Sequence, residues 1–122
     1  MVALCAPLTD ETRGMIDAAA LARMKPSAYF INVGRGASVD EAALARALAA
    51  KQIAEAAVDV FAEEPPPAGH PLYGLDNVIV SPHVSGFLPS YDEKCSVLFA
   101  ENFRRYLAGP PLLNLVDRAR GY

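Results

Sequence analysis

Three apolar stretches of the sequence are each followed, within a few residues, by side chains that could do chemistry. Arg35 stands between two glycines after AYFINV, while Asp59 and the acidic pair Glu63 and Glu64 come after AAV. His83 follows NVIVSP. A guanidinium can bind a carboxylate through two hydrogen bonds, a histidine can transfer a proton near neutral pH, and a nearby carboxylate can hold the imidazole. Together these groups suit acid–base chemistry on a substrate that carries a carboxylate.

The elements that must position these groups alternate along the chain. Strands that alternate with helices through short loops indicate parallel βαβ units, and near-continuous apolar strands such as YFINV suit a sheet covered on both faces. We therefore expect an α/β fold with a doubly wound parallel sheet, in which ligands bind outside the carboxyl ends of the strands. The predicted strands are residues 2–6, 28–33, 56–60 and 77–81.

Two helices are expected between these strands. Asp17 is predicted to cap the first, which Lys25-Pro26 stops. Ser38 and Glu41 have the spacing of a capping box, so the second helix is expected to begin there and to run to about Lys51.

The third and longest helix follows the last strand. Ser90 and Glu93 form a second capping-box pattern, and Gly109 ends the helix. Apolar residues recur along one face from Tyr91 to Leu107, including Cys95, so we expect this face to pack in a core or an interface.

Composition narrows the function classes. The chain has 122 residues, which indicates one domain, and a net charge of −3 without a basic run, which argues against nucleic acid or an anionic membrane as a partner. No apolar stretch approaches the ~18 residues of a membrane span, and no export signal is recognised, so a cytoplasmic location is expected. Cys5 and Cys95 lack CxxC spacing, which predicts packed thiols and no metal site.

Three motifs in order and spacing, INVGRG, AAVDVFAEEP and IVSPHVSG, resemble the later part of the D-2-hydroxyacid dehydrogenases. The opening LCAPLTDETRGMI and the closing VDRARGY resemble bacterial members, so the resemblance covers nearly the whole chain. It implies a partial Rossmann-type sheet, with residues 1–108 as the C-terminal half of a dinucleotide-binding domain. Residues 109–122 would be a tail packed on the family's substrate domain. The family's GxGxxG turn does not occur in this chain.

The resemblance also implies roles for individual residues. Arg35 would bind the substrate carboxylate and polarise its keto oxygen, and His83 would be the acid and base. Glu64, directly before proline in DVFAEEP, would pair with His83 in preference to Glu63. A glutamate at position 64 argues against a formate dehydrogenase. The expected cofactor-binding residues are Pro7, Thr9, Val33, Gly34, Asp59, His83, Ser85 and Gly86.

The implied activity is hydride transfer between NAD or NADP and a small 2-oxo or 2-hydroxy acid, in an enzyme that is a homodimer at full length. The isolated chain is expected to be inactive. The alternative is a non-catalytic, cofactor-sensing or interaction module, as in the corepressors that share this fold. The first strand would be interior in the family's complete sheet, so we expect it to have an unpaired edge here and the chain to be marginally stable or oligomeric.

Each chemical group also has a plainer interpretation. Arg35 could be a surface or ion-pairing residue, and His83 a loop histidine satisfied by one backbone hydrogen bond. The carboxylates after the third strand could be solvated loop and strand-end groups. His70, in AGHPLYG, is assigned to this plainer class.

Overall fold

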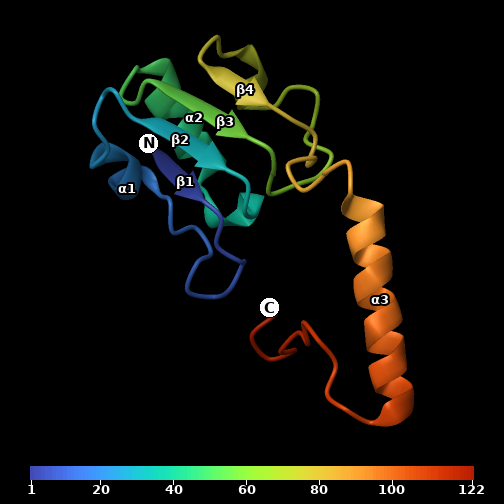
Figure 1. The fold of residues 1–122 in the computed structure, drawn as a ribbon. Helices are drawn as coiled ribbons and strands as arrows, with labels where there is room; N and C mark the ends of the chain where they lie inside the picture. Colours follow the sequence, from blue (N-terminus) through green and yellow to red (C-terminus); the bar gives the residue numbers. More distant parts are fainter. The chain divides into compact units, whose positions relative to one another are not determined.

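The computed structural model describes residues 1–122, which divide into two compact units, residues 1–85 and residues 86–122. The first unit carries a parallel sheet in the order β1-β2-β3-β4, which confirms the expected α/β class (Figure 1). Its strands are β1 (Val2–Leu4), β2 (Tyr29–Asn32), β3 (Glu55–Val58) and β4 (Val78–Val80). The observed strands are shorter than the predicted runs, and only β3 extends beyond its run, by one residue.

The core of the first unit lies between the sheet and two helices, α1 (Ala18–Ala22) and α2 (Glu41–Ala49), which pack against each other. Alternate residues of β2 are buried, among them Phe30, because successive side chains of a strand point to opposite faces. Phe30 joins Leu21 of α1 and Leu44 of α2 in a single hydrophobic cluster. Two short 3-10 helices, Gly36–Ser38 and Pro71–Gly74, complete this unit.

The two helix starts differ from each other in how well the sequence predicts them. Asp17 caps α1 as expected, with its carboxylate accepting a hydrogen bond of 2.7 Å from the Ala20 amide. The capping box predicted at Ser38 and Glu41 is wrong, because Asp40 is the cap and accepts from the Ala43 amide at 2.8 Å.

The reason for this difference lies in the pairing of the chain before α2. The amide of Ile16 donates to the Ser38 carbonyl, and the amide of Asp40 donates to the Ile16 carbonyl. These two bonds hold Val39 extended in a parallel bridge with Ile16. The helix therefore cannot begin before Asp40, and it ends at Ala49, close to the expected Lys51.

Strand β1 pairs only with β2, so the unpaired edge expected for the first strand is confirmed. Backbone N–H and C=O groups along such an edge have no partners within the sheet. No helix in the structure combines the length and the apolar character needed to cross a bilayer.

The second unit contains the long helix α3 (Tyr91–Ala108), which ends at Gly109 in a left-handed conformation with φ of 90°. Ser90 occupies the cap position, but its side chain makes no capping hydrogen bond, so the second capping box is also wrong. The tail folds back on α3, since the Asn102 amide group both donates to the Leu113 carbonyl, at 3.1 Å, and accepts from the Leu113 amide, at 2.7 Å.

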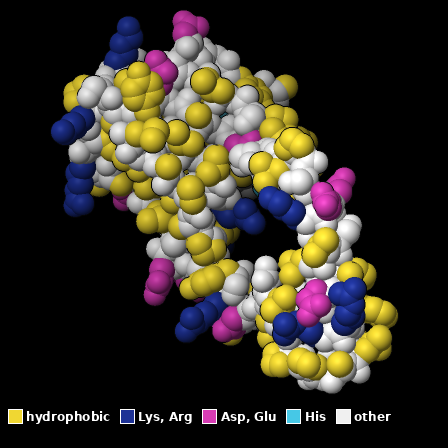
Figure 2. Space-filling model, in the orientation of Figure 1, with side chains coloured by type: hydrophobic (Ala, Val, Ile, Leu, Met, Phe, Trp, Pro, Cys, Tyr) yellow, Lys and Arg dark blue, Asp and Glu magenta, His cyan; other side chains and the backbone are white.

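No residue of α3 is buried, and hydrophobic side chains lie open on the molecular surface (Figure 2). Cys95 and Cys5 are both exposed, so the prediction of packed thiols is wrong. The contact with the tail does not bury the apolar face of α3, so Cys95 on this face stays exposed. The tail boundary expected after residue 108 concerns packing on a further domain and stays a prediction.

Candidate active site

The candidate groups of the first unit lie at one edge of its sheet. All four strands are parallel, so their carboxyl ends meet at the same edge. Each strand leads into some of the expected site residues. Pro7 and Thr9 follow β1; Val33, Gly34 and Arg35 follow β2; Asp59 and Glu64 follow β3; His83 and Ser85 follow β4. Gly86 is the first residue of the second unit.

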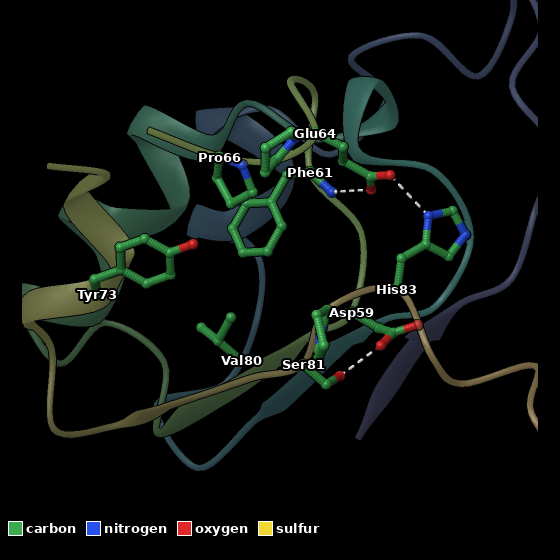
Figure 3. A pocket seen from close by; sticks show the side chains of 10 residues that line it. Asp59, Phe61, Glu64, Pro66, Tyr73, Val80, Ser81 and His83 are labelled. Atoms are coloured by element: carbon green, nitrogen blue, oxygen red, sulfur yellow. Dashed lines mark hydrogen bonds and ion pairs between the residues drawn. The ribbon is translucent and has the colours of Figure 1, made fainter. Parts of the chain in front are cut away.

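His83 and Glu64 form the central pair of this edge (Figure 3). Nδ1 of His83 lies 2.8 Å from one carboxylate oxygen of Glu64, and the Phe61 amide donates to the other oxygen at 2.8 Å. The bond with His83, then the bond from the Phe61 amide, lowers the pKa of Glu64 below its ordinary value, and the positive charges of His83 and Arg35 add to this effect. The pairing of Glu64 with His83 that the resemblance implies is present in this geometry.

The protonation of this pair follows from the ionised carboxylate. Because ionised Glu64 can only accept, Nδ1 of His83 carries the hydrogen that lies between them. Nε2 is then the ring nitrogen that can exchange a proton with a substrate. The His83 side chain is 50% exposed, so Nε2 is accessible to a small molecule.

Asp59 fixes the loop that carries His83. One carboxylate oxygen accepts from the Ser81 hydroxyl at 2.5 Å and from the Val84 amide at 2.9 Å, and the other accepts from the Ser85 amide at 2.9 Å. The Asp59 carbonyl also accepts from the His83 amide at 2.8 Å. Asp59 thus binds four residues of the loop, Ser81, His83, Val84 and Ser85.

This network determines the charge of Asp59 and the backbone of His83. Burial of the Asp59 carboxyl, which is 3% exposed, opposes ionisation, but the hydrogen bonds from Ser81, Ser85 and Val84 outweigh it and hold the pKa well below its usual range. His83 itself has a positive φ of 55°, a conformation that is uncommon for a residue with a side chain. Asp59 therefore supports an unusual loop shape that projects the imidazole.

The turn with Arg35 is organised by Asn32, which sequence reasoning missed. The buried Asn32 side chain accepts from the Gly34 amide at 3.1 Å and donates to the Arg35 carbonyl at 3.3 Å. The available signal was a polar amide at the end of an otherwise apolar strand. A side chain at Gly34 would place its Cβ 2.9 Å from the Ala6 carbonyl oxygen, so only glycine fits there.

Arg35 itself is exposed, and one of its terminal nitrogens donates to the Gly34 carbonyl at 2.8 Å. The other N–H groups of the guanidinium make no hydrogen bond within the protein. The charge of Arg35 contributes to the lowered pKa of Glu64, so the guanidinium and the His83–Glu64 pair lie within electrostatic reach of each other.

A cavity of about 480 Å³ lies beside the His83–Glu64 pair. Phe61, Tyr73 and Val80 provide apolar walls, and the ion pair lies on one side (Figure 3). Tyr73 and Phe61 were not among the expected site residues. Tyr73 lies in the 3-10 helix Pro71–Gly74, away from any predicted strand end. The cavity gives a small organic molecule an apolar surface next to a proton donor.

The remaining expected residues show less direct geometry. The Pro7 carbonyl accepts from the Thr12 hydroxyl at 2.7 Å, and Thr9 exchanges hydrogen bonds with Thr12, so both belong to a locally bonded turn. Val33 has an exposed side chain at the end of β2. The cofactor contacts expected for Pro7, Thr9 and Val33 stay predictions.

His70 has the structural role that was assigned to it. Its Nε2 lies 3.1 Å from Glu41, and its Nδ1 accepts from the Leu72 amide at 3.4 Å. Both ring nitrogens are engaged with protein groups, and the side chain is only 9% exposed.

Among curated proteins, the chain is 43% identical over 112 residues to a glyoxylate reductase of Aeropyrum pernix, covering 92% of this chain and 33% of that protein. It is 49% identical over 111 residues to glyoxylate/hydroxypyruvate reductase B of Pectobacterium carotovorum, covering 91% of this chain and 35% of that protein. The chain thus spans about a third of the length of these relatives.

The chain is also similar to solved structures of a dehydrogenase and a reductase. A D-isomer specific 2-hydroxyacid dehydrogenase of Xanthobacter autotrophicus Py2, in complex with NADPH and MES, is 49% identical with a TM-score of 0.89, over 99% of this chain and 49% of that chain. An NADPH-dependent glyoxylate/hydroxypyruvate reductase of Sinorhizobium meliloti, in complex with NADP and sulfate, is 33% identical with a TM-score of 0.89, over 98% of this chain and 39% of that chain.

The family model described as D-isomer specific 2-hydroxyacid dehydrogenase, NAD binding domain, matches residues 1–85, which is the whole of the first unit. The matched residues include the strand ends that carry Arg35, Glu64 and His83. The chain therefore belongs to the D-isomer-specific 2-hydroxyacid dehydrogenase family, and residues 1–85 form part of its NAD-binding domain.

Proposed function

We propose that this chain provides the catalytic arginine, glutamate and histidine of an NAD(P)-dependent dehydrogenase that interconverts a small 2-oxo acid and its 2-hydroxy acid. The observation that carries the proposal is the His83–Glu64 contact of 2.8 Å, together with an exposed guanidinium at Arg35 whose charge helps to lower the pKa of Glu64. The names of the relatives, several of them glyoxylate or hydroxypyruvate reductases, favour a small substrate of this kind.

The residues at the sheet edge suit the nicotinamide half of a dinucleotide. Pro7 and Val33 are exposed at neighbouring strand ends and offer an apolar surface to a ring. One carboxylate oxygen of Asp59 accepts a single amide hydrogen bond, from Ser85, and can accept another from a carboxamide N–H. No GxGxxG turn for the pyrophosphate occurs in this chain. A bound reduced nicotinamide would supply the hydride.

Arg35 would hold the substrate. A guanidinium has five N–H donors in a planar fork, and one nitrogen of Arg35 is engaged with the Gly34 carbonyl. The remaining donors can bind the carboxylate of a 2-oxo acid through two parallel hydrogen bonds. The same positive charge would stabilise the negative charge that develops on the keto oxygen during reduction.

His83 would move the proton. Nε2 gives its proton to the keto oxygen as the alkoxide forms, and in the oxidation direction it takes that proton back. Ionised Glu64 keeps the hydrogen on Nδ1 and fixes the orientation of the ring through its own bond to the Phe61 amide. Each of the three side chains thus has a separate task, namely binding, proton transfer and orientation.

The test measures reduction of glyoxylate and hydroxypyruvate with NADH and NADPH. It uses the 122-residue chain and a hybrid in which this chain replaces the matching part of the Xanthobacter autotrophicus relative. We expect turnover by the hybrid and none by the chain alone. Arg35→Ala and Glu64→Gln should each lower kcat/KM by about 100-fold or more.

Glu63→Gln is the matched control, because it removes the same charge from the neighbouring residue, whose side chain has no hydrogen bond in the structure. A folded hybrid in which Glu64→Gln is as active as Glu63→Gln would overturn the assignment. A hybrid that binds NADPH without turnover would instead favour the non-catalytic module. We also propose a homodimer for the complete enzyme, which sedimentation of the hybrid tests.

A further inference from the structure

A second carboxylate–histidine pair lies behind the candidate active site. Glu41, the first residue of α2, has one carboxylate oxygen 3.1 Å from Nε2 of His70. The two side chains are 17% and 9% exposed, so the pair is much less accessible than His83 and Glu64. The mechanism proposed above uses neither residue.

The other carboxylate oxygen of Glu41 accepts a hydrogen bond of 2.7 Å from the Ala62 amide. The preceding amide, of Phe61, donates to Glu64. Two successive backbone amides are therefore bound by two different carboxylates. One carboxylate belongs to the candidate site, and the other comes from the start of α2.

The same segment is held by two further contacts. A Cβ on Gly36 would lie 1.9 Å from the Phe61 carbonyl carbon, so the backbone after Arg35 packs directly on the backbone of Phe61. The Phe61 ring meets the His70 ring edge to face, with 5.1 Å between the centroids. Residues 61 and 62 are thus fixed by groups that follow Arg35 in the chain and by His70.

We propose that Glu41 is a positioning residue for this site. By binding the Ala62 amide and His70 together, it fixes the segment that leads to Glu64 against the turn that follows Arg35, and so keeps Glu64 within hydrogen-bond distance of His83. This inference rests on the proposed function for its effect on turnover, but its effect on the geometry of Glu64 does not depend on turnover.

The first experiment follows the Glu64 carboxyl carbon by NMR during a pH titration of the 122-residue chain, with Glu64→Gln used to assign the signal. In Glu41→Ala the segment loses its anchor, so we expect the pKa of Glu64 to rise toward its ordinary value of 4.5. Asp40→Ala is the matched control, since it removes the cap of α2 but leaves the Ala62 contact in place. It should lower the melting temperature and leave the Glu64 titration unchanged.

Glu41→Gln keeps an oxygen that can accept from the Ala62 amide, so it should restore most of the Glu64 titration. If Glu41→Ala does not fold, Glu41→Met takes its place, because it keeps most of the side-chain volume but offers no oxygen to the Ala62 amide. A raised Glu64 pKa in Glu41→Met and an unchanged one in Asp40→Ala then support the proposal. An unchanged Glu64 titration in a folded Glu41→Ala, or an equal change in Asp40→Ala, would overturn the proposal.

The second experiment measures kinetics of the hybrid. Glu41→Ala should lower kcat by about 10-fold, because a misplaced catalytic group slows the chemical step, while KM for the oxo acid changes little. If Arg35→Ala and Glu64→Gln leave turnover unaffected, the proposed function fails, and the NMR titration still decides the role of Glu41. A KM effect without a kcat effect would contradict the positioning role.

Discussion

The molecule contains two histidine–glutamate pairs of similar chemistry in different surroundings. His83 and Glu64 lie 2.8 Å apart at the strand ends, and their side chains are 50% and 36% exposed. His70 and Glu41 lie 3.1 Å apart behind the same loop and are 9% and 17% exposed. The pair in itself therefore does not identify a site; the difference lies in what else the atoms bind.

In the pair behind the loop, both oxygens of Glu41 and both ring nitrogens of His70 are engaged with protein groups. At the strand ends, Nδ1 is the ring nitrogen of His83 that binds a protein group, and Nε2 makes no hydrogen bond within the protein. A histidine can exchange a proton with a substrate only through a nitrogen that is not already bonded. The pair of His70 and Glu41 is thus suited to hold the backbone, and the pair of His83 and Glu64 is suited to chemistry.

The largest effect is expected at the exposed pair. His83→Ala should lower kcat of the hybrid by about 10²–10⁴-fold, because the proton donor is lost. Its free energy of unfolding should change by less than about 1 kcal/mol, since a half-exposed ion pair contributes little to stability. Steady-state kinetics and urea unfolding of the same preparation measure both. A stability loss without a kinetic loss would reverse the roles of the two pairs.

The opposite pattern is expected at His70. His70→Ala should lower the free energy of unfolding by about 1–3 kcal/mol, because one Glu41 oxygen and the Leu72 amide lose partners in a mostly buried place. Turnover should fall by less than about 10-fold, because the Ala62 contact with Glu41 remains. Urea unfolding followed by circular dichroism provides the comparison. A fall in activity as large as that of His83→Ala would refute the distinction.

The smallest effect concerns acid. The pKa of Glu64 is lowered in the folded state, so its contribution to stability is present above the ordinary value of 4.5 and is lost as the pH falls through the folded value. The pKa of Asp59 is also lowered, so its contribution to stability is likewise lost as the pH falls below the ordinary value of 3.8. Between about pH 5 and pH 3, wild type should therefore lose more stability than Glu64→Gln, by roughly 1 kcal/mol or less. Urea unfolding at several pH values measures this difference. The same dependence of the unfolding free energy on pH in both proteins would argue against the Glu64 contact.

The order of the strands was sufficient to predict that Arg35, an acidic pair and His83 lie at one edge, because parallel strands bring distant segments together. The choice of Glu64 over Glu63 came from the family resemblance. The supporting contacts were not predictable in this way. Glu41 reaches Ala62 across 21 residues, and Asp59 reaches Ser85 across 26, and no local pattern encodes such contacts.

Local patterns also failed where tertiary pairing competed with them. Ser38 and Glu41 have the spacing of a capping box, yet the bridge between Ile16 and Val39 delays the helix by two residues. Because Glu41 does not take part in a capping box, its side chain binds the Ala62 amide and His70 instead. The failed prediction and the positioning contact thus have one cause.

The approach of Gly36 to Phe61 has a consequence for how the site can vary. Since backbone meets backbone there, with no side chain between them, the spacing between the arginine turn and the acidic loop equals the thickness of the chain itself. If side chains separated the two segments, substitutions could change the distance between them by one methyl group at a time. With backbone against backbone, no substitution can change the distance in such small steps. Variation in the shape of this edge would therefore have to come from the surrounding side chains, while the distance between these two segments stays constant.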